Sequence, residues 1–270
     1  MIARLALYAA VAGRSFQRYA TYRAATLAGV FTNTVFGVII CYTYIALWQQ
    51  RPSLGGYDVS DALTYAWLGQ SLVVTVAIFG MGFQDEFADR VRRGDIAVDL
   101  YRPVSLQLWW LASDLGRAFF QVAARGIPPT LIGAVLFDLR FPADPLVWIW
   151  FAVSVGLAVV VSFGYRYLVG LSAFWLVDSR GLEYLVGVAA LFLSGMALPL
   201  VVFPDWLGTI ARILPFSATI QVPNDIFLGK DTGWDLVAAL GFQMAWAIGL
   251  LACGHLVTAL ATRKLVVAGG

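Results

Sequence analysis

The 270-residue sequence has little charge of either sign. Lys, Arg, Asp and Glu together make up 13% of the chain, whereas 60% of its residues are hydrophobic. A soluble domain carries about 25% charged residues, so this composition excludes an ordinary soluble enzyme. The net charge of +2 also gives no basic surface for nucleic acid.

Residues that carry catalytic or metal chemistry are equally scarce. The two cysteines, Cys41 and Cys253, lie in apolar runs, which excludes a disulfide framework and a cysteine-based zinc site. The single histidine, His255, is expected to face neighbouring helices. Neither a G-x-S-x-G nucleophile motif nor a G-x-x-x-x-G-K-[ST] phosphate-binding loop is present. We therefore expect no catalytic, cofactor or metal site in this chain.

Long apolar runs dominate what is present. A membrane span needs about 20 apolar residues, and six runs reach that length. We predict an all-α integral membrane protein, a single transmembrane domain over residues 1–270, with spans at about 24–47, 62–83, 116–137, 146–171, 184–203 and 234–260.

Three other segments complete the predicted architecture. Residues 1–22 alternate apolar and basic side chains at helical spacing, which indicates an interfacial helix. Pro128 and Pro129 should kink the third span, because neither can donate a backbone hydrogen bond. Residues 204–232 are too polar and too rich in proline to span, so we expect a re-entrant pair of short helices broken at Pro215.

Lys and Arg are distributed unevenly between the two sides of these spans. Twelve lie on one side and four on the other, and basic residues favour the cytoplasmic side. We therefore predict a plasma-membrane protein with both termini on the cytoplasmic side. The twelve are Arg4, Arg14, Arg18, Arg23, Arg90, Arg92, Arg93, Arg102, Arg117, Arg180, Arg263 and Lys264; the four are Arg51, Arg140, Arg212 and Lys230.

A charged stretch between the second and third spans, residues 84–115, stands out. Its first part predicts a short amphipathic helix, with apolar Phe83, Phe87 and Val91 four residues apart on one side. Acidic residues near its start, arginines near its end and a following glycine suit the helix dipole and a glycine C-cap. The acidic and basic side chains of the segment are Asp85, Glu86, Asp89, Arg90, Arg92 and Arg93.

Few polar residues fall inside the predicted spans. Arg125 and Arg166 lie close to the inner interface, and we interpret both as snorkelling residues, with substrate contact as the alternative for Arg125. Four amides either line a transport path or cross-link helices: Asn33, Gln70, Gln121 and Gln243. Every acidic residue falls in a loop or at a span end, which argues against a proton-coupled carrier.

Several short motifs occur along the chain in a fixed order. They are Arg92-Arg93-Gly94-Asp95, Leu100-Tyr101-Arg102-Pro103-Val104-Ser105, Leu115-Gly116-Arg117, Leu214-Pro215-Phe216, Pro223, Ile226 to Lys230 as IFLGK, Gln243 to Trp246, and the closing Val266 to Gly270. In order and spacing, these motifs resemble the type-2 ATP-binding-cassette (ABC) exporter permeases of the short six-span bacterial form. The match covers nearly the whole chain. Arg93 and Ala268 depart from the pattern, which has a small residue and a glutamine there.

The resemblance implies a permease that pairs with a second permease, of the same or a different chain, and exports a hydrophobic or amphipathic small molecule from the cytoplasm or inner leaflet. Separate ABC ATPase subunits would bind ATP and Mg²⁺ and drive it. Residues 84–95 would be the coupling helix that meets the ATPase. Its candidate residues are Glu86, Phe87, Asp89, Arg90, Arg92, Arg93, Gly94 and Asp95.

Other interpretations stay open at this point. The arginines of residues 84–95 could serve only to enforce topology and to contact anionic headgroups. The whole chain could be a secondary transporter or channel that works without an ATPase. A membrane-embedded scaffold or enzyme is the least supported alternative, because no nucleophile, metal or acid–base cluster is visible.

Overall fold

The computed structural model describes the backbone of residues 2–78, 80, 82–176 and 178–268, and side chains over 4–78, 80, 82–176 and 178–263. Every regular element in these ranges is helical, which confirms the all-α prediction. Lys264 and the closing Val266 to Gly270 motif lie outside the described side chains.

The helices follow one another with short connections. The α-helices are α1 (Ile2–Ala20), α2 (Arg23–Gln50), α3 (Val59–Thr75), α4 (Gln84–Arg93), α5 (Ile96–Leu100), α6 (Leu106–Gln121), α7 (Ile127–Leu136), α8 (Pro145–Leu171), α9 (Arg180–Leu193), α10 (Asp205–Ile213), α11 (Gln221–Phe227) and α12 (Trp234–Ala268). Short 3-10 or π segments are η1 (Leu54–Gly56), η2 (Val122–Gly126), η3 (Ser172–Phe174), η4 (Leu200–Val202) and η5 (Ser217–Thr219).

Four helical stretches in the described chain are long and apolar enough to cross a membrane: Arg23–Gln50, Leu106–Leu136, Pro145–Phe174 and Trp234–Arg263. The two other expected spans are represented by shorter helices, α3 with 17 residues and α9 with 14. α9 ends early because Gly195 adopts a positive φ of 88° and Pro199 follows.

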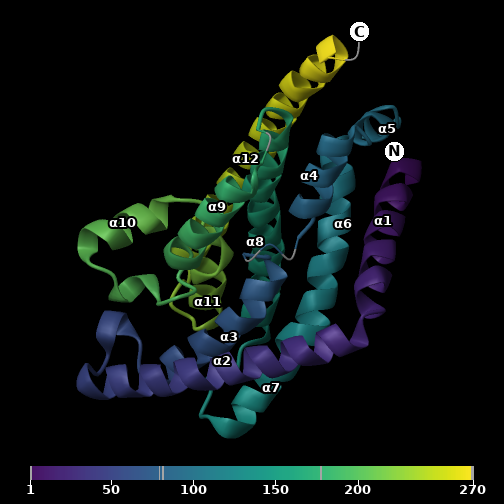
Figure 1. Ribbon diagram of the computed structural model, residues 1–270. Coiled ribbons are helices and arrows are strands. Elements are labelled where there is room, and N and C mark those ends of the chain that lie inside the picture. Colours follow the sequence, from purple (N-terminus) through teal and green to yellow (C-terminus); the bar gives the residue numbers. More distant parts are fainter. Residues whose placement is uncertain (1, 79, 81, 177, 269–270) are drawn as a thin grey trace.

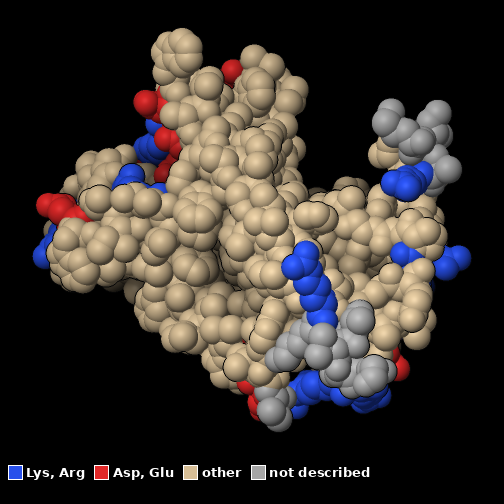
Figure 2. All heavy atoms as spheres, turned by 90° about the horizontal axis from the view of Figure 1, so that it is seen from above, with Lys and Arg blue, Asp and Glu red and all other residues tan. Residues whose placement is uncertain are grey.

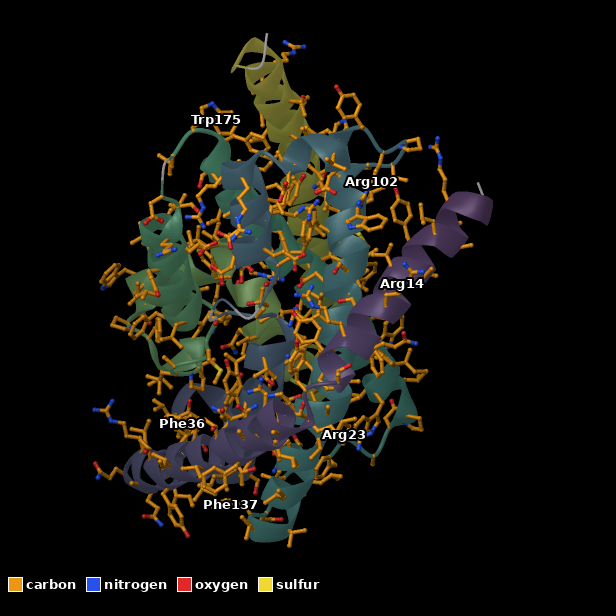
Figure 3. All side chains as sticks on the ribbon, turned by 45° about the vertical axis from the view of Figure 1, so that its right-hand side comes forward. Arg14, Arg23, Phe36, Arg102, Phe137 and Trp175 are labelled. Atoms are coloured by element: carbon orange, nitrogen blue, oxygen red, sulfur yellow. The ribbon has the colours of Figure 1, made fainter. Side chains whose placement is uncertain are left out.

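Both termini lie at the same end of the molecule, together with α4 and α5 (Figure 1). We call this the terminal end. α6, α8 and α12 run along the long axis of the molecule, and α2 crosses its opposite end. Figure 3 shows Arg102 and Trp175 at the terminal end and Phe36 and Phe137 at the opposite end.

α1 packs lengthwise against α6. The Phe16 ring lies 5.5 Å from that of Phe120, centroid to centroid, and the backbone of Ala12 reaches Gly116 of α6. Only glycine permits this approach, because a Cβ at position 116 would overlap the carbonyl oxygen of Ala12. The helix expected over residues 1–22 is thus an integral part of the bundle.

α3 is the most deeply buried helix of the bundle. Trp67 is fully buried between α2 and α7, where Gly37 and Gly133 leave room for its ring. Nearly every α3 side chain from Asp61 to Thr75 is buried. The second expected span therefore forms the centre of the subunit rather than its surface.

The Pro128-Pro129 break appears as a widened helical turn. The segment Val122–Gly126 is a π-helix, and α7 begins directly after it with the prolines in its first turn. The prolines cannot donate backbone hydrogen bonds, and a π segment is a common way for a long helix to accommodate such a gap. The stretch from Leu106 to Leu136 thereby stays one continuous helix.

A polar network holds the end opposite the termini. Asp225 accepts hydrogen bonds from the Tyr57 hydroxyl and, at 2.8 Å, from Gln221. Asp61 at the start of α3 forms ion pairs with Lys230 at 2.6 Å and with Arg140 at 2.8 Å. These bonds fix α11 and the α7–α8 loop to the start of α3.

The charged side chains of the terminal end lie mainly at its margins. Figure 2 looks down on this end and shows Lys and Arg side chains toward the edges of the view, with uncharged surface over much of the remainder.

Replacing Gly116 with alanine should destabilise the fold, because the added Cβ overlaps a backbone atom of α1 that cannot move independently. Overpacking of this kind costs about 1–3 kcal/mol, and we expect a lower Tm for the detergent-solubilised protein. Gly156→Ala in α8 is the matched control, since no atom lies within 4 Å of its Cβ position. An equal Tm for the two variants would contradict the α1–α6 packing.

Asp231 provides a pH-dependent test of the network opposite the termini. Burial, with the nearby charges of Asp225 and Asp235, raises the pKa of Asp231 to about 6. Because the folded-state pKa exceeds the unfolded value, the stability that Asp231 contributes is fully present below pH 4 and is lost as the pH rises through 6. We expect Asp231→Asn to raise the Tm at pH 7.5 and to change it little near pH 4. A Tm difference that is constant with pH would contradict the burial of this carboxyl group.

Candidate functional site

α4 has the ends that its sequence predicts. Asp85 and Glu86 lie in its first turn and three arginines in its last turn. Gly94 ends the helix with a left-handed φ of 80°, and its N–H bonds back to the carbonyl of Val91. This charge order stabilises the helix through its dipole, and Gly94 adopts the conformation without a Cβ penalty.

The apolar side of α4 is seated on an aromatic cluster. Phe87 is fully buried, and its ring lies 5.7 Å from Trp110 of α6 and 5.6 Å from Tyr167 of α8, measured between centroids. Gly170 of α8 sits close beneath the same ring. Phe87 therefore anchors α4 to α6 and α8 at once.

Part of the charged side braces α4 to its neighbour α5. The Arg90 guanidinium donates hydrogen bonds to both carboxylate oxygens of Asp99, at 2.6 and 2.9 Å. This hydrogen bonding to Asp99 raises the pKa of Arg90. Arg102 adds a second contact to Asp99 at 3.3 Å. Arg90 thus fixes the corner between the two helices while its side chain stays 29% exposed.

The other charged residues of α4 lie nearer the surface. Glu86 pairs with Arg18 of α1 at 2.8 Å, and Asp89 pairs with Arg92 at 2.6 Å. Arg93 and Asp95 are exposed. The outward face of α4 therefore consists of Glu86, Asp89, Arg90, Arg92 and Arg93, with Asp95 just beyond the helix, whereas Phe87 is buried.

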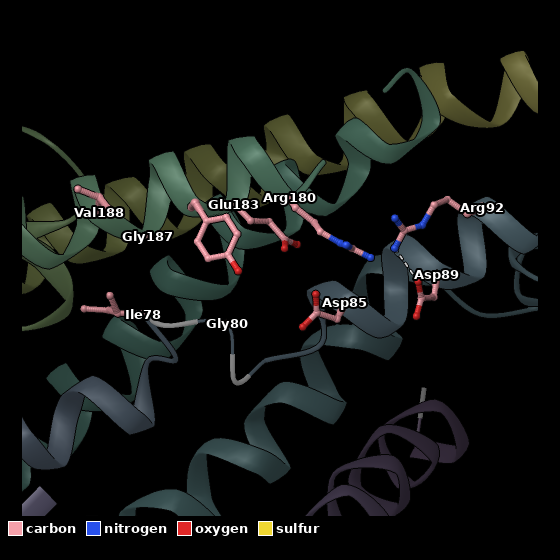
Figure 4. Close-up of a pocket in the computed structure, with 10 residues that line it drawn as sticks. Ile78, Gly80, Asp85, Asp89, Arg92, Arg180, Glu183, Gly187 and Val188 are labelled. Atoms are coloured by element: carbon pink, nitrogen blue, oxygen red, sulfur yellow. Dashed lines mark hydrogen bonds and ion pairs between the residues drawn. The ribbon is translucent and has the colours of Figure 1, made fainter. Parts of the chain in front are cut away.

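A cavity of about 570 Å³ separates α4 from α9 (Figure 4). Its apolar side includes Ile78 and Val188, and charged residues of both helices line the remainder. Asp85 projects from α4, and Glu183 and Arg180 project from α9. The cavity therefore combines an apolar wall with charged walls directly beside α4.

A buried ion cluster lies beneath α4. Asp114 of α6 binds Arg117 at 2.7 Å and Arg166 of α8 through its other carboxylate oxygen. All three residues are at most 2% exposed. Gln84, the first residue of α4, lies 3.4 Å from Arg166. One aspartate thus holds two guanidinium groups inside the helix bundle.

The same cluster holds the last turn of α3. Arg117 donates to the carbonyl oxygens of Val74 at 2.9 Å and Thr75 at 2.7 Å. Ser162 of α8 accepts from Arg166 at 3.0 Å and donates to the carbonyl of Val76. The cluster therefore joins α3, α4, α6 and α8 at one point.

Two interpretations from the sequence are wrong here. Arg166 does not snorkel, because Asp114 gives it a buried partner. Asp114 lies inside a candidate span, although we expected every acidic residue to lie outside or at a span end. The spacing Asp114-x-x-Arg117 places both residues on one helix face, and this spacing was the sequence signal from which their ion pair could have been predicted. The partner on α8 was not visible in the sequence.

Three of the polar residues expected near the path come together. The Asn33 amide of α2 donates to the carbonyl oxygens of Gln70 at 3.3 Å and Arg125 at 3.4 Å. The Arg125 guanidinium packs against Gly29 of α2. In this conformation Asn33 cross-links α2, α3 and η2.

Gln121 and Gln243 have different surroundings. Gln121 and Arg125 line one cavity of about 330 Å³, and Oε1 of Gln121 has no hydrogen-bond donor among the described residues. Gln243 of α12 is fully buried and bonds Ser154 of α8 at 2.9 Å and the Ala218 carbonyl at 2.8 Å. Gln243 thus cross-links helices, and Gln121 and Arg125 stay candidates for the transport path.

His255 is exposed on α12, which contradicts the expectation that it faces other helices. Across the described ranges, no three His, Cys, Asp or Glu side chains are placed to hold a metal ion.

Comparison with known proteins then decides the family. The model of the family described as ABC-2 family transporter protein matches residues 26–269. The chain belongs to this family. The resemblance inferred from the motifs is thereby confirmed, and the chain is a permease of the ABC-2 type. The match includes α4 and the buried ion cluster. No curated protein and no solved structure gave a match.

Asp114→Asn should strongly destabilise the permease, because Arg117 and Arg166 would lose their shared counter-charge. Breaking a buried ion pair costs about 3–5 kcal/mol, and we expect a large drop in Tm and in yield of folded protein. Asp114→Asn/Arg166→Gln restores the wild-type net charge of the cluster and should recover part of the loss. A double variant no more stable than Asp114→Asn would contradict the cluster's electrostatic role.

Proposed function

We propose that this permease is the membrane half of an ABC exporter. Two permeases pair, separate ATPase subunits that bind ATP and Mg²⁺ dock on α4 from the cytoplasm, and the complex moves a hydrophobic or amphipathic molecule outward. The observation that carries this proposal is the construction of α4. It has an exposed charged face and is joined to three helices, α3, α6 and α8, through Phe87 and the ion cluster.

Force applied to α4 would spread through packed side chains. Phe87 transmits displacement to α6 and α8, and Gln84 contacts the cluster that holds the end of α3. Close-packed interiors deform little, so such a joint moves its neighbours together. The Arg90–Asp99 pair makes α4 and α5 one rigid unit. ATPase motion would thereby reach the membrane helices.

The surfaces of α2 and α9 supply the place for a second permease. Leu27 and Phe31 of α2 are 70% and 71% exposed, and Tyr184 of α9 is 76% exposed. α3 is buried within the subunit and offers no such surface. We propose that α2 and α9 face the partner permease and the substrate path.

The cavity between α4 and α9 supports an amphipathic substrate. It has an apolar wall at Ile78 and Val188 and charged residues at its other walls. A molecule with one apolar and one polar part matches such a lining. Its position beside α4 would let bound substrate and coupling helix influence each other.

A secondary transporter without an ATPase is the alternative. Such a carrier usually needs a carboxylate inside the membrane that loads and releases a proton. Asp114 is buried in a candidate span, but Arg117 and Arg166 occupy its two oxygens. This arrangement favours a structural role and supports the ATP-driven interpretation.

Co-purification separates the two functions. The tagged permease is extracted from its native membrane with a mild detergent, and the soluble proteins that accompany it are identified. A protein with a G-x-x-x-x-G-K-[ST] loop in stoichiometric amount is the expected result. Transport by the reconstituted permease alone, with no such protein bound, would support the secondary transporter instead.

Arg92→Glu/Arg93→Glu should abolish substrate-stimulated ATP hydrolysis of the assembled complex and export. Two glutamates on the outward face of α4 would repel an acidic surface of the ATPase. Charges at the rim of an interface act mainly on the association rate. Phe87 and Arg90 are untouched, so the protein should still insert and pair.

Arg51→Glu/Arg212→Glu at the opposite end is the matched control and should keep coupled activity. Cysteine labelling of both termini checks that topology is unchanged, which separates coupling from an effect on orientation. Normal coupled activity in a correctly oriented Arg92→Glu/Arg93→Glu variant would exclude α4 as the coupling helix.

A further inference from the structure

A second cavity lies on the other side of α4, between α1 and α6. Its volume is about 320 Å³. Leu7, Ala10 and Val11 of α1 form an apolar wall, and Trp109 and Trp110 of α6 lie across from them. Glu86 is the residue of α4 that lines it. The lining of the cavity is therefore partly apolar and partly polar.

The polar part of this cavity is rich in hydrogen-bond donors. Arg14 and Arg18 lie one helical turn apart on the same face of α1. Between them, Ser15 meets Ser113 of α6, with 3.4 Å between the hydroxyl oxygens. Two guanidinium groups and two hydroxyls thus surround a lining whose single carboxylate is Glu86.

Trp110 forms part of the apolar wall of this cavity. Its side chain is only 5% exposed, and its indole nitrogen has almost no accessible surface, so the ring contributes packing surface and not a hydrogen-bond donor to the cavity.

We propose that this cavity binds the phosphate headgroup of an anionic phospholipid. Arg14 and Arg18 contact the phosphodiester, Ser15 lies within the same lining as a further donor, and an acyl chain follows Leu7 and Val11 along α1. Arginine forms paired, charge-assisted hydrogen bonds to phosphate oxygens.

A lipid fits this lining better than free phosphate does. The apolar wall of α1 has no function for an inorganic ion, whereas it suits a hydrocarbon chain. Paired tryptophans with nearby arginines are typical of the headgroup region of a membrane.

The bound headgroup would compete with α4 for Arg18. Arg18 pairs with Glu86 at 2.8 Å in this structure, and both side chains are partly exposed. A phosphate beside Arg18 weakens that pair and repels Glu86. If α4 is the coupling helix, as proposed above, anionic lipid would loosen its tie to α1 and so regulate coupling; the binding site itself does not depend on that function.

Native mass spectrometry of the full-length permease, released from mild detergent, tests the binding site without any ATPase. The probes are dioleoylphosphatidylglycerol, dioleoylphosphatidylcholine with the same chains, and inorganic phosphate. We expect one tightly bound phosphatidylglycerol. Arg14→Gln should weaken it about fivefold, the contribution of one cationic side chain beside an anionic headgroup. Arg14→Lys should retain most of the binding.

Variants with opposite effects sharpen the test. Glu86→Gln removes the carboxylate from the lining and should tighten phosphatidylglycerol binding severalfold. Arg51→Gln, at the opposite end of the chain, is the control and should leave binding unchanged. Circular dichroism and Tm confirm that each variant is folded.

Three outcomes would overturn the proposal. Equal binding of the two lipids would exclude headgroup recognition. Displacement of phosphatidylglycerol by millimolar inorganic phosphate would identify a soluble-anion site instead. Equal affinity of the folded Arg14→Gln variant and wild type would place the lipid elsewhere. Failure to recover an ATPase partner would overturn the proposed function but leave this binding result intact, so the two can fail separately.

Discussion

The ion cluster around Asp114 is the interaction on which the rest of this structure depends. Burying an isolated charge in a helix bundle is strongly unfavourable, and here one carboxylate offsets two guanidinium groups. The remaining donors are satisfied by carbonyl oxygens at the end of α3 and by Ser162. All of these hydrogen bonds can form only when α3, α6 and α8 pack in this one arrangement.

The position of α4 follows from that geometry. Gln84 reaches the cluster through Arg166, and Phe87 enters the aromatic pocket that α6 and α8 form above it. The helix has two buried attachments and one exposed charged face. Cavities lie on both sides of it, toward α9 and toward α1. A helix so placed can respond to molecules on either side and pass a displacement inward.

The two ends of the molecule are held in different ways. Opposite the termini, Asp61 and Asp225 collect bonds from four segments and tie α11 and the α7–α8 loop to α3. At the terminal end, the pair between Arg18 and Glu86 is exposed and therefore contributes little to stability. The permease thus has a firmly tied end and an end where contacts can exchange, which suits a coupling element at the latter.

The sequence by itself determined the class and family of this protein. Composition gave an all-helical membrane protein, the charges and Gly94 defined α4 within one or two residues, and ordered motifs indicated the ABC-2 family. These features are local or additive, so a single chain shows them. The tertiary structure alone decided which residues meet. It paired Asp114 with Arg166 across 52 positions, paired Arg90 with Asp99, buried α3 and exposed His255. Helical periodicity fixes the face of a residue on its own helix, but the partner of that face depends on how helices pack, and packing is set by contacts distant in sequence.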